Sequence, residues 1–265
     1  AIFDVCPSPP LKWSYTTCQN LLDLARTAMP AEIISMPQIG ATGPATIAGS
    51  LIQHHAEVLS GIVMAETVNP GTPVIYGGSP SLFDMRYGTS RIAAPEAILL
   101  TAAYIGICGF LGLPCHAYLC LSDSKTLDYQ AGMETLMGAL IALLTGVNVA
   151  SGPGMLEYES VLSIEKILLD SEVIEVASRI LRGFEIADET IALDVMKRVV
   201  TGKMHYLTEK HTLKWYRREH YIPMLVDTTT VEAREPDRII GRAREKVLEV
   251  LRSARSKVLE EKLFS

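Results

Sequence analysis

Apolar and polar positions alternate in blocks along the first two thirds of the chain. Short, nearly continuous apolar runs rich in strand-forming residues occur at 1–6, 31–36, 72–78, 114–120 and 147–152. Each run is followed by a loop and then by a longer segment with helical spacing. These helical segments are 17–29, 44–67, 95–111, 127–145 and 163–183. Strands that are buried on both faces and separated by helices are typical of βαβ units, so the pattern predicts an α/β fold with a parallel sheet.

Proline and glycine mark the ends of several predicted helices. Pro44 and Pro95 fit the first helical position, where proline loses no hydrogen bond. Gly112, Gly146 and Gly183 fit left-handed C-caps.

The character of the chain changes after residue 184. Residues 188–200 predict one helix, residues 204–223 an irregular aromatic segment, and residues 237–257 a charged amphipathic helix. We expect a βα-repeat portion over 1–183 and, in the same domain, a helical and irregular extension over 184–265 that packs on it.

Five strands cannot close an eight-stranded parallel barrel, so two architectures remain. One is a complete open, doubly wound sheet. The other is the C-terminal part of a (β/α)8 TIM-type barrel, about five βα units plus C-terminal helices. The chain lacks an initiator Met, which trimming or the loss of an N-terminal portion would explain. In both architectures ligands bind beyond the carboxyl ends of the strands.

Composition narrows the function classes. The net charge of −6 and the absence of a basic stripe argue against nucleic acid. The chain has 5 cysteines and no CxxC pair, which indicates reduced thiols in a cytoplasmic protein without a zinc module. No secretory signal is evident at the first residue given. We expect no metal site.

One uncharged stretch, 97–121, is long enough to span a bilayer. Gly112 and Pro114 divide it into a helix and a strand, so a buried helix and strand are expected instead of a membrane anchor. The very apolar helix 95–111 favours self-association into a homo-oligomer.

The run 114–120 leads through Leu121 into an abrupt polar turn that contains Ser122, Asp123 and Lys125. A lysine at a strand end is either a Schiff-base residue, as in aldolase-type barrels, or a charge partner of the nearby aspartate.

Two further loops carry candidate ligand groups. In the loop 76–88, Tyr76, Phe83 and Asp84 suit a cation and Arg86 suits a carboxylate, or Asp84 and Arg86 form a solvated pair. In the loop after the last strand, Glu157 and Tyr158 either point into the same mouth or cap the next helix.

The glycine-rich stretch 40–49 is neither a dinucleotide fingerprint nor a P-loop. It is either a tight turn or a helix start at Gly43 whose free N–H groups bind an anion such as a substrate carboxylate.

Several runs together resemble one family. They include "CPSPPLKWS", "GPATIAGSLIQHHAEVLSGIVMAE", "PGTPVIYGG" with "FDMRYGT", "SDSK" with "DYQAGME", and "GMLE" with "EKILLDSEVI". They extend from Cys6 to Leu251, and the chain resembles the trimethylamine methyltransferase family, corrinoid-dependent enzymes that transfer a methyl group from an amine to a cobalamin-type protein. Family members are (β/α)8 barrels almost twice this length, which implies that this chain is the C-terminal part of one.

The resemblance also gives Leu121 a meaning. Members that demethylate trimethylamine carry pyrrolysine at this position, before the "SD.K" turn. Leucine cannot form the imine adduct attributed to pyrrolysine, so the chain is similar to the non-pyrrolysine branch, whose characterised members act on quaternary amines such as glycine betaine. The resemblance implies no covalently bound cofactor and a corrinoid supplied by a partner corrinoid protein.

Site roles follow from the same resemblance. Leu121, Ser122, Asp123 and Lys125 are expected to shape the barrel mouth beneath the docked corrinoid. The remaining candidates are expected to bind the substrate: an aromatic cage of Tyr76, Phe83, Tyr118 and Tyr158, the carboxylates Asp84 and Glu157, and Arg86 or Gly43 for a substrate carboxylate.

The leading hypothesis is therefore a corrinoid-dependent methyltransferase, or the C-terminal part of one, that acts on a quaternary amine. A non-catalytic small-amine-binding paralogue on the same barrel is the second hypothesis. A Schiff-base lyase that uses Lys125 is the third.

Overall fold

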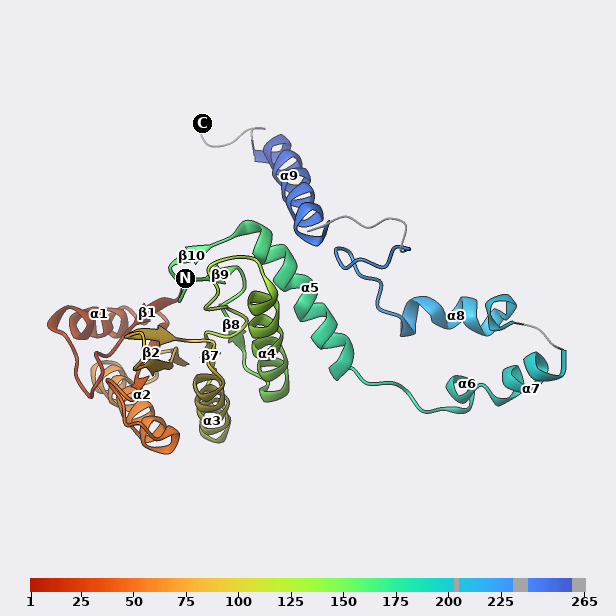
Figure 1. Cartoon of the computed structure of the whole chain (residues 1–265). Coiled ribbons are helices and arrows are strands. Elements are labelled where there is room, and N and C mark those ends of the chain that lie inside the picture. Colours follow the sequence, from red (N-terminus) through yellow and green to blue (C-terminus); the bar gives the residue numbers. More distant parts are fainter. Residues whose placement is uncertain (203–204, 231–237, 259–265) are drawn as a thin grey trace.

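The computed structural model describes residues 1–202, 205–230 and 238–258 (Figure 1). The five predicted strands are all present. They are β1 (Phe3–Val5), β2 (Ala31–Ser35), β4 (Val74–Gly78), β7 (His116–Ala117) and β8 (Val149–Ala150). One parallel sheet has the order β1-β2-β4 and β7 pairs in parallel with β8. A parallel bridge between Tyr76 and Cys115 joins the two sheets, so the strands are neighbours in chain order.

The five parallel strands form an open sheet, which we call the wall. The described residues contain no closed barrel, and the five strands supply consecutive parallel neighbours of the kind that a barrel or an open sheet uses. The α/β class and the parallel pairing predicted from the sequence are confirmed. A complete (β/α)8 barrel is not seen among the described residues.

A helix follows each strand of the wall. These helices are α1 (Tyr15–Arg26), α2 (Ile47–Val68), α3 (Pro95–Leu111), α4 (Tyr129–Thr145) and α5 (Ile164–Leu181). Pro95 is at the start of α3, and Gly112 and Gly146 are left-handed C-caps with φ of 67° and 69°, as predicted. The predicted helix start at Pro44 is wrong, because α2 begins three residues later, where the Thr46 side chain accepts the amide of Gly49.

Alternate residues of each strand face the helices. The side chain of Ile33 lies against Gly61 of α2, and the Ser35 hydroxyl donates to Glu57 of the same helix at 2.6 Å. The residues between them, such as Glu32, therefore point to the opposite side of the sheet. We call this side the inner face of the wall.

The loops contain short strands that the sequence pattern did not reveal. They are β3 (Gln38–Ile39), β5 (Ser81–Asp84), β6 (Thr89–Arg91), β9 (Met155–Leu156) and β10 (Val161–Leu162). A sheet of order β3-β5-β6 follows the ends of β2 and β4, and β9 pairs with β10 in an antiparallel hairpin after β8. These pairings give the strand-end loops a fixed shape.

The C-terminal region differs from its prediction in two places. Its elements are α6 (Asp188–Ile191), α7 (Leu193–Gly202), the 3-10 helix η1 (Tyr206–Thr208), α8 (Lys210–Glu219) and α9 (Arg238–Val258). The single helix predicted over 188–200 is wrong, because Ala192 takes a left-handed conformation with φ of 56° and separates α6 from α7. The irregular segment predicted over 204–223 contains η1 and α8; residue 204, like residue 237 of the last predicted helix, lies outside the described residues.

Figure 1 shows α6, α7 and α8 beyond the C-terminal end of α5, whereas α9 lies near the N-terminal half of α5. Glu172 of α5 fixes the returning chain by accepting the backbone amides of Met224, Leu225 and Val226 at 3.1, 2.7 and 3.1 Å. Arg244 of α9 then pairs with Glu165 at 3.4 Å. Within the described residues, none of the helices combines the length and apolar character that a membrane crossing requires.

Candidate functional site

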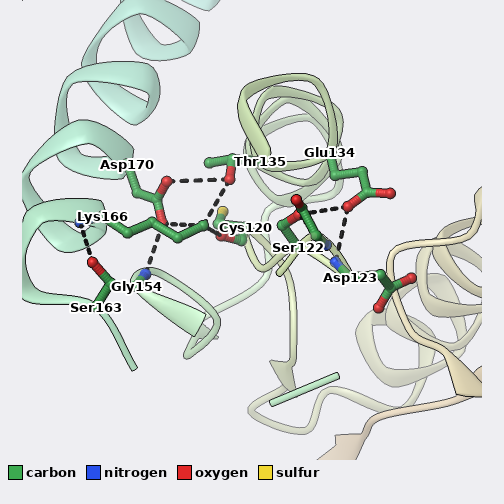
Figure 2. A network of polar contacts seen from close by, with 10 residues as sticks. Cys120, Ser122, Asp123, Glu134, Thr135, Gly154, Ser163, Lys166 and Asp170 are labelled. Atoms are coloured by element: carbon green, nitrogen blue, oxygen red, sulfur yellow. Dashed lines mark hydrogen bonds and ion pairs between the residues drawn. The ribbon is translucent and has the colours of Figure 1, made fainter. Parts of the chain in front are cut away.

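The polar turn after β7 is buried and tied to α4. Glu134 accepts the Ser122 hydroxyl at 2.6 Å and the Asp123 amide at 2.8 Å through the same oxygen (Figure 2). Ser122, Asp123 and Glu134 are all almost inaccessible to solvent. Glu134 of α4 therefore fixes the predicted mouth residues Ser122 and Asp123. The sequence pattern did not single out this glutamate.

The Asp123 carboxylate points away from Glu134 in Figure 2. Its two oxygens accept the backbone amides of Ile92 and Ala93, each at 3.1 Å. Burial raises the pKa of the Asp123 carboxyl to about 6, and nearby Glu134 acts in the same direction. Asp123 thus connects the turn after β7 to the residues that precede α3.

Leu121 is 3% exposed, and two glycines, Gly138 and Gly152, pack closely against the backbone beside it. A Cβ on Gly138 of α4 would lie 2.5 Å from the amide nitrogen of Cys120. A Cβ on Gly152 would overlap the Leu119 carbonyl oxygen and lie 2.8 Å from the amide nitrogen of Leu121. Cys120 itself has a left-handed φ of 69°, so the direction of Leu121 is set by a strained and tightly enclosed backbone.

A buried ion pair of α5 supports the same strand end (Figure 2). Lys166 is 1% exposed and its ammonium group lies 2.5 Å from Asp170, 2.9 Å from the Thr135 hydroxyl and 3.5 Å from the Cys120 carbonyl oxygen. Asp170 also accepts the Gly154 amide at 2.7 Å. We call Lys166, Asp170 and Thr135 the strand-end clamp, because together they join α4, α5 and the backbone at Cys120 and Gly154.

Five of the predicted site residues, Asp84, Arg86, Asp123, Lys125 and Tyr158, line one groove of about 420 Å³. It is lined by Asp84, Arg86, Tyr87, Thr89, Arg91, Asp123, Ser124, Lys125, Thr126, Asp128, Gln130 and Tyr158. Lys125 is exposed, with its ammonium group 5.2 Å from the centre of the Tyr158 ring. A Schiff-base lysine is usually desolvated, which Lys125 is not.

Asp84 and Arg86 pair with each other inside this groove. The Arg86 guanidinium donates to the two Asp84 oxygens at 3.0 and 2.6 Å. These hydrogen bonds hold the pKa of the Asp84 carboxyl at about 2. Of the two alternatives that the sequence left open for these residues, the structure therefore has the Asp84–Arg86 pair and not two free charges. Phe83, the preceding residue, is partly buried in β5.

The turn after β9 is backbone-strained. Glu157, Tyr158 and Glu159 have consecutive positive φ values of 48°, 56° and 69°. The Glu157 amide donates to the Ser124 carbonyl at 3.0 Å, which joins this turn to the polar turn. Glu159 accepts the Ser79 hydroxyl at 3.2 Å, and burial raises the pKa of its carboxyl. Such strain is frequent at ligand sites.

Tyr76 and Gly43 are two of the predicted residues that do not line this groove. Tyr76 is fully buried on the helix side of the sheet, where its hydroxyl lies 3.0 Å from Nδ1 of His55. The Gly43 amide donates to the Gln38 carbonyl at 2.9 Å, so it is not free for an anion and the glycine-rich stretch is a tight turn.

Tyr118 lies on the inner face, with its ring edge-on to His116 at 5.0 Å. Burial raises the pKa of the Tyr118 hydroxyl to about 12. His116 contacts Glu32 through Nδ1 and lies 2.6 Å from the Ser151 hydroxyl through Nε2. The sequence reading did not single out Glu32, His116 or Ser151, although an acid and a histidine inside apolar strand runs were a visible signal.

The described part of the chain has no group of three or more His, Cys, Asp or Glu side chains arranged to hold a metal ion. The arrangement can position a small polar molecule, with a polar turn, an aromatic ring and a charged rim at the strand ends and a second polar cluster on the inner face.

Comparison with known proteins adds the family. The glycine betaine methyltransferase of Desulfitobacterium hafniense (strain Y51) is 40% identical over 224 residues, 84% of this chain and 47% of that protein. Trimethylamine methyltransferase MttB2 of Methanosarcina mazei is 38% identical over 208 residues, 78% of this chain and 42% of that protein. Trimethylamine methyltransferase MttB of Methanosarcina thermophila is 34% identical over 259 residues, 97% of this chain and 53% of that protein.

The chain thus spans about half the length of these curated relatives. The sequence model of the family described as "Trimethylamine methyltransferase (MTTB)" matches residues 2–263. The chain therefore belongs to the trimethylamine methyltransferase family.

Proposed function

We propose that the protein carrying this chain transfers a methyl group from a quaternary amine, such as glycine betaine, to the Co(I) of a corrinoid held by a partner protein. The observation that carries this proposal is the groove at the strand ends, which is lined in part by the polar turn that directly follows buried Leu121, the position where a reactive imine would otherwise be expected. The relative named glycine betaine methyltransferase, at 40% identity, supports the substrate class.

The chemistry fits an aliphatic residue at this position. A quaternary ammonium departs as a neutral tertiary amine when one methyl group is removed, so the protein does not need to supply a proton. The residues of this chain then have two tasks, to orient the methyl group and to exclude water. The ring of Tyr158, which lines the groove and already lies 5.2 Å from the Lys125 ammonium group, suits a methylated cation.

The groove of about 420 Å³ is too small to enclose a corrinoid, which fits a corrinoid that stays on its partner protein and meets the mouth from outside. When bound there, the corrinoid supplies the nucleophile. We infer further that the five-strand parallel wall is part of a (β/α)8 barrel, because the relatives are about twice as long as this chain.

The test uses the whole protein, a partner corrinoid protein reduced to Co(I), and a panel of glycine betaine, other quaternary amines and trimethylamine. We expect methyl-cobalt absorbance with a quaternary amine and none with trimethylamine. No methyl-cobalt with any quaternary amine would contradict the proposal. Calorimetry on the same samples identifies the alternative, because tight betaine binding without methyl transfer would indicate a non-catalytic amine-binding protein.

A further inference from the structure

The groove at the strand ends is lined by three cationic side chains, and one of them is paired. Arg86 donates to both oxygens of Asp84. Arg91 and Lys125 line the same groove, and within the described residues neither of them has a hydrogen-bond acceptor or a carboxylate at ion-pair distance. Arginine has five N–H donors and lysine has three, so the groove presents several donors that the protein itself does not use.

The carboxylates of the groove, by contrast, are engaged by other donors. Asp123 accepts two backbone amides, each at 3.1 Å. Asp128 is the N-cap of α4, where it accepts the amide of Ala131 at 3.0 Å together with two hydroxyl groups. Asp84 is bound by Arg86. The groove therefore has unused donors and occupied acceptors, and the group that would complete it is an anionic acceptor such as a carboxylate.

The backbone of Arg91 is fixed on both sides. Arg91 ends β6, where it pairs with Leu82 of β5, and the amides of the next two residues are bound by Asp123. Arg91 lies close enough to Asp84 and Asp123 for its charge to act on both carboxyls, yet in the described part of the chain its guanidinium group donates to neither. A planar guanidinium on a fixed, half-buried residue is well placed to bind a ligand carboxylate.

Lys125 reaches the groove from the polar turn. The carbonyl of the preceding residue, Ser124, accepts the amide of Glu157 at 3.0 Å, which fixes the polar turn against the turn that carries Tyr158. The Lys125 ammonium group lies 5.2 Å from the centre of the Tyr158 ring. A positive charge thus already lies next to the ring that suits a methylated cation. It repels a simple ammonium ion at this ring, whereas a zwitterion brings its own carboxylate to offset the repulsion.

We propose that Arg91 binds the carboxylate of a zwitterionic substrate, with Lys125 as a second cationic contact, and that the groove thereby selects carboxylated quaternary amines over simple ammonium cations. This inference rests on the proposed function and names its specificity-determining residue. The guanidinium fork can donate two parallel hydrogen bonds to one carboxylate, and the lysine adds a point charge. Arg86 and Gly43, which the sequence suggested for this carboxylate, are already bound within the protein.

The first test measures binding of glycine betaine and choline to the whole protein by calorimetry. Both probes have a trimethylammonium head, but choline has a neutral hydroxyl in place of the carboxylate. The natural protein should bind betaine more tightly than choline. Arg91→Gln should weaken betaine binding by about tenfold or more, as for loss of hydrogen bonds between charged groups. Choline affinity should stay within about twofold or rise, because the removed charge repels it.

Two further variants sharpen this test. Lys125→Gln should weaken betaine binding by only about two- to fivefold, because the lysine is exposed and its pairing is screened by water. Arg26→Gln is the matched control, since it removes the same charge from an exposed site on α1 outside the groove and should change neither probe. Urea unfolding of each variant establishes that it is folded.

A second measurement separates the substrate from the partner protein as the source of the anionic group. The affinity of the corrinoid protein for the whole protein is measured without substrate. It should be the same for the natural protein and for Arg91→Gln, because the proposed ligand of Arg91 is the substrate carboxylate.

Four results would overturn the inference. They are unchanged betaine affinity in folded Arg91→Gln, an equal loss for betaine and choline, a loss confined to the corrinoid protein, and a natural protein that binds choline at least as tightly as betaine. Each leaves the proposed function intact if methyl transfer from a quaternary amine is still observed. Arg91-dependent betaine binding without methyl transfer would instead contradict the proposed function and retain this site.

Discussion

Two ion pairs near the strand ends have similar short-range sequence spacing and opposite surroundings. Lys166 and Asp170 are four residues apart on α5, with side chains 1% and 4% exposed. Asp84 and Arg86 are two residues apart on a loop, with the aspartate side chain 7% and the arginine side chain 74% exposed. The first pair reaches the backbone at Cys120 and Gly154, whereas the second closes on its own loop.

The difference shows that burial and third partners, rather than the pairing itself, decide what an ion pair contributes. Removing one member of a buried pair leaves an uncompensated charge in a poorly polarisable environment. Removing one member of an exposed pair leaves a charge that water solvates. The strand-end clamp therefore supports the fold around Leu121, and the Asp84–Arg86 pair mainly shapes the rim of the groove.

The largest effect is expected from Lys166→Met, which leaves Asp170 buried without its cation. Unfolding free energy measured with urea should fall by about 3–5 kcal/mol. The double variant Lys166→Met/Asp170→Leu, which removes the stranded charge, should recover much of this loss. A loss below about 1 kcal/mol for the single variant would place the buried pair in the same class as exposed pairs.

Gly152→Ala tests how tightly the backbone around Leu121 is enclosed. The new methyl group would overlap the Leu119 carbonyl oxygen, a backbone atom that cannot rotate away, so we expect a loss of about 3 kcal/mol in urea unfolding. Gly132→Ala is the control, because a Cβ there meets nothing within 4 Å. That helical substitution on α4 should be neutral or stabilising by up to about 1 kcal/mol. Equal effects of the two variants would contradict the close approach.

The pH dependence of stability should have opposite signs at Asp123 and Asp84. The pKa of Asp123 is raised from 3.8 to about 6, so its contribution to stability is present at low pH and is lost as the pH rises through that range. The pKa of Asp84 is lowered from 3.8 to about 2, so its contribution is present above that range and is lost as the pH falls.

The measurement is urea unfolding of the natural protein, Asp123→Asn and Asp84→Asn at several pH values. The unfolding free energy of the natural protein minus that of Asp123→Asn should decrease by about 1–2 kcal/mol between pH 4 and pH 6. The unfolding free energy of the natural protein minus that of Asp84→Asn should decrease as the pH falls from 4 to 2. Parallel pH profiles for the two differences would show that burial does not separate these carboxylates.

The smallest effect is expected from Arg86→Ala. The arginine side chain is 74% exposed, and the 7% exposed Asp84 keeps the backbone amide of residue 86 as a donor at 2.9 Å, so the loss in unfolding free energy should stay below about 1 kcal/mol and shrink further in high salt. Thermal unfolding at low and high ionic strength checks both statements. A loss comparable to that of Lys166→Met would show that the rim pair supports more than its own loop.

Much of the wall could be predicted from the sequence. Its strands are short, almost continuously apolar runs of the kind that parallel sheets use, and its helices end at residues with clear backbone preferences, such as Gly112 and Gly146. The helix start at Pro44 and the uninterrupted helix through Ala192 were wrong, because a side-chain cap and a left-handed residue overrode the local pattern. The pairings of β3, β5 and β6 are too short to leave a periodic signal.

The candidate site was predictable only in part. Loops that follow parallel strands meet at one edge, which is why Asp84, Asp123 and Tyr158 line a common groove as the strand order suggests. The pairing of Asp84 with Arg86 and the engaged amide of Gly43 depend on loop geometry that the sequence pattern does not specify. Whether these residues bind substrate stays a prediction.

The sequence by itself determined the α/β class, the parallel pairing and the family, because apolar periodicity and extended residue identity are properties of the chain. Only the tertiary structure decided which polar side chains share a face and which are solvated. Glu32, His116 and Ser151 lie far apart along the chain and meet because strand register allows it. Contact and burial are set by packing between distant segments, and they determine the charge, orientation and availability of every group at the site.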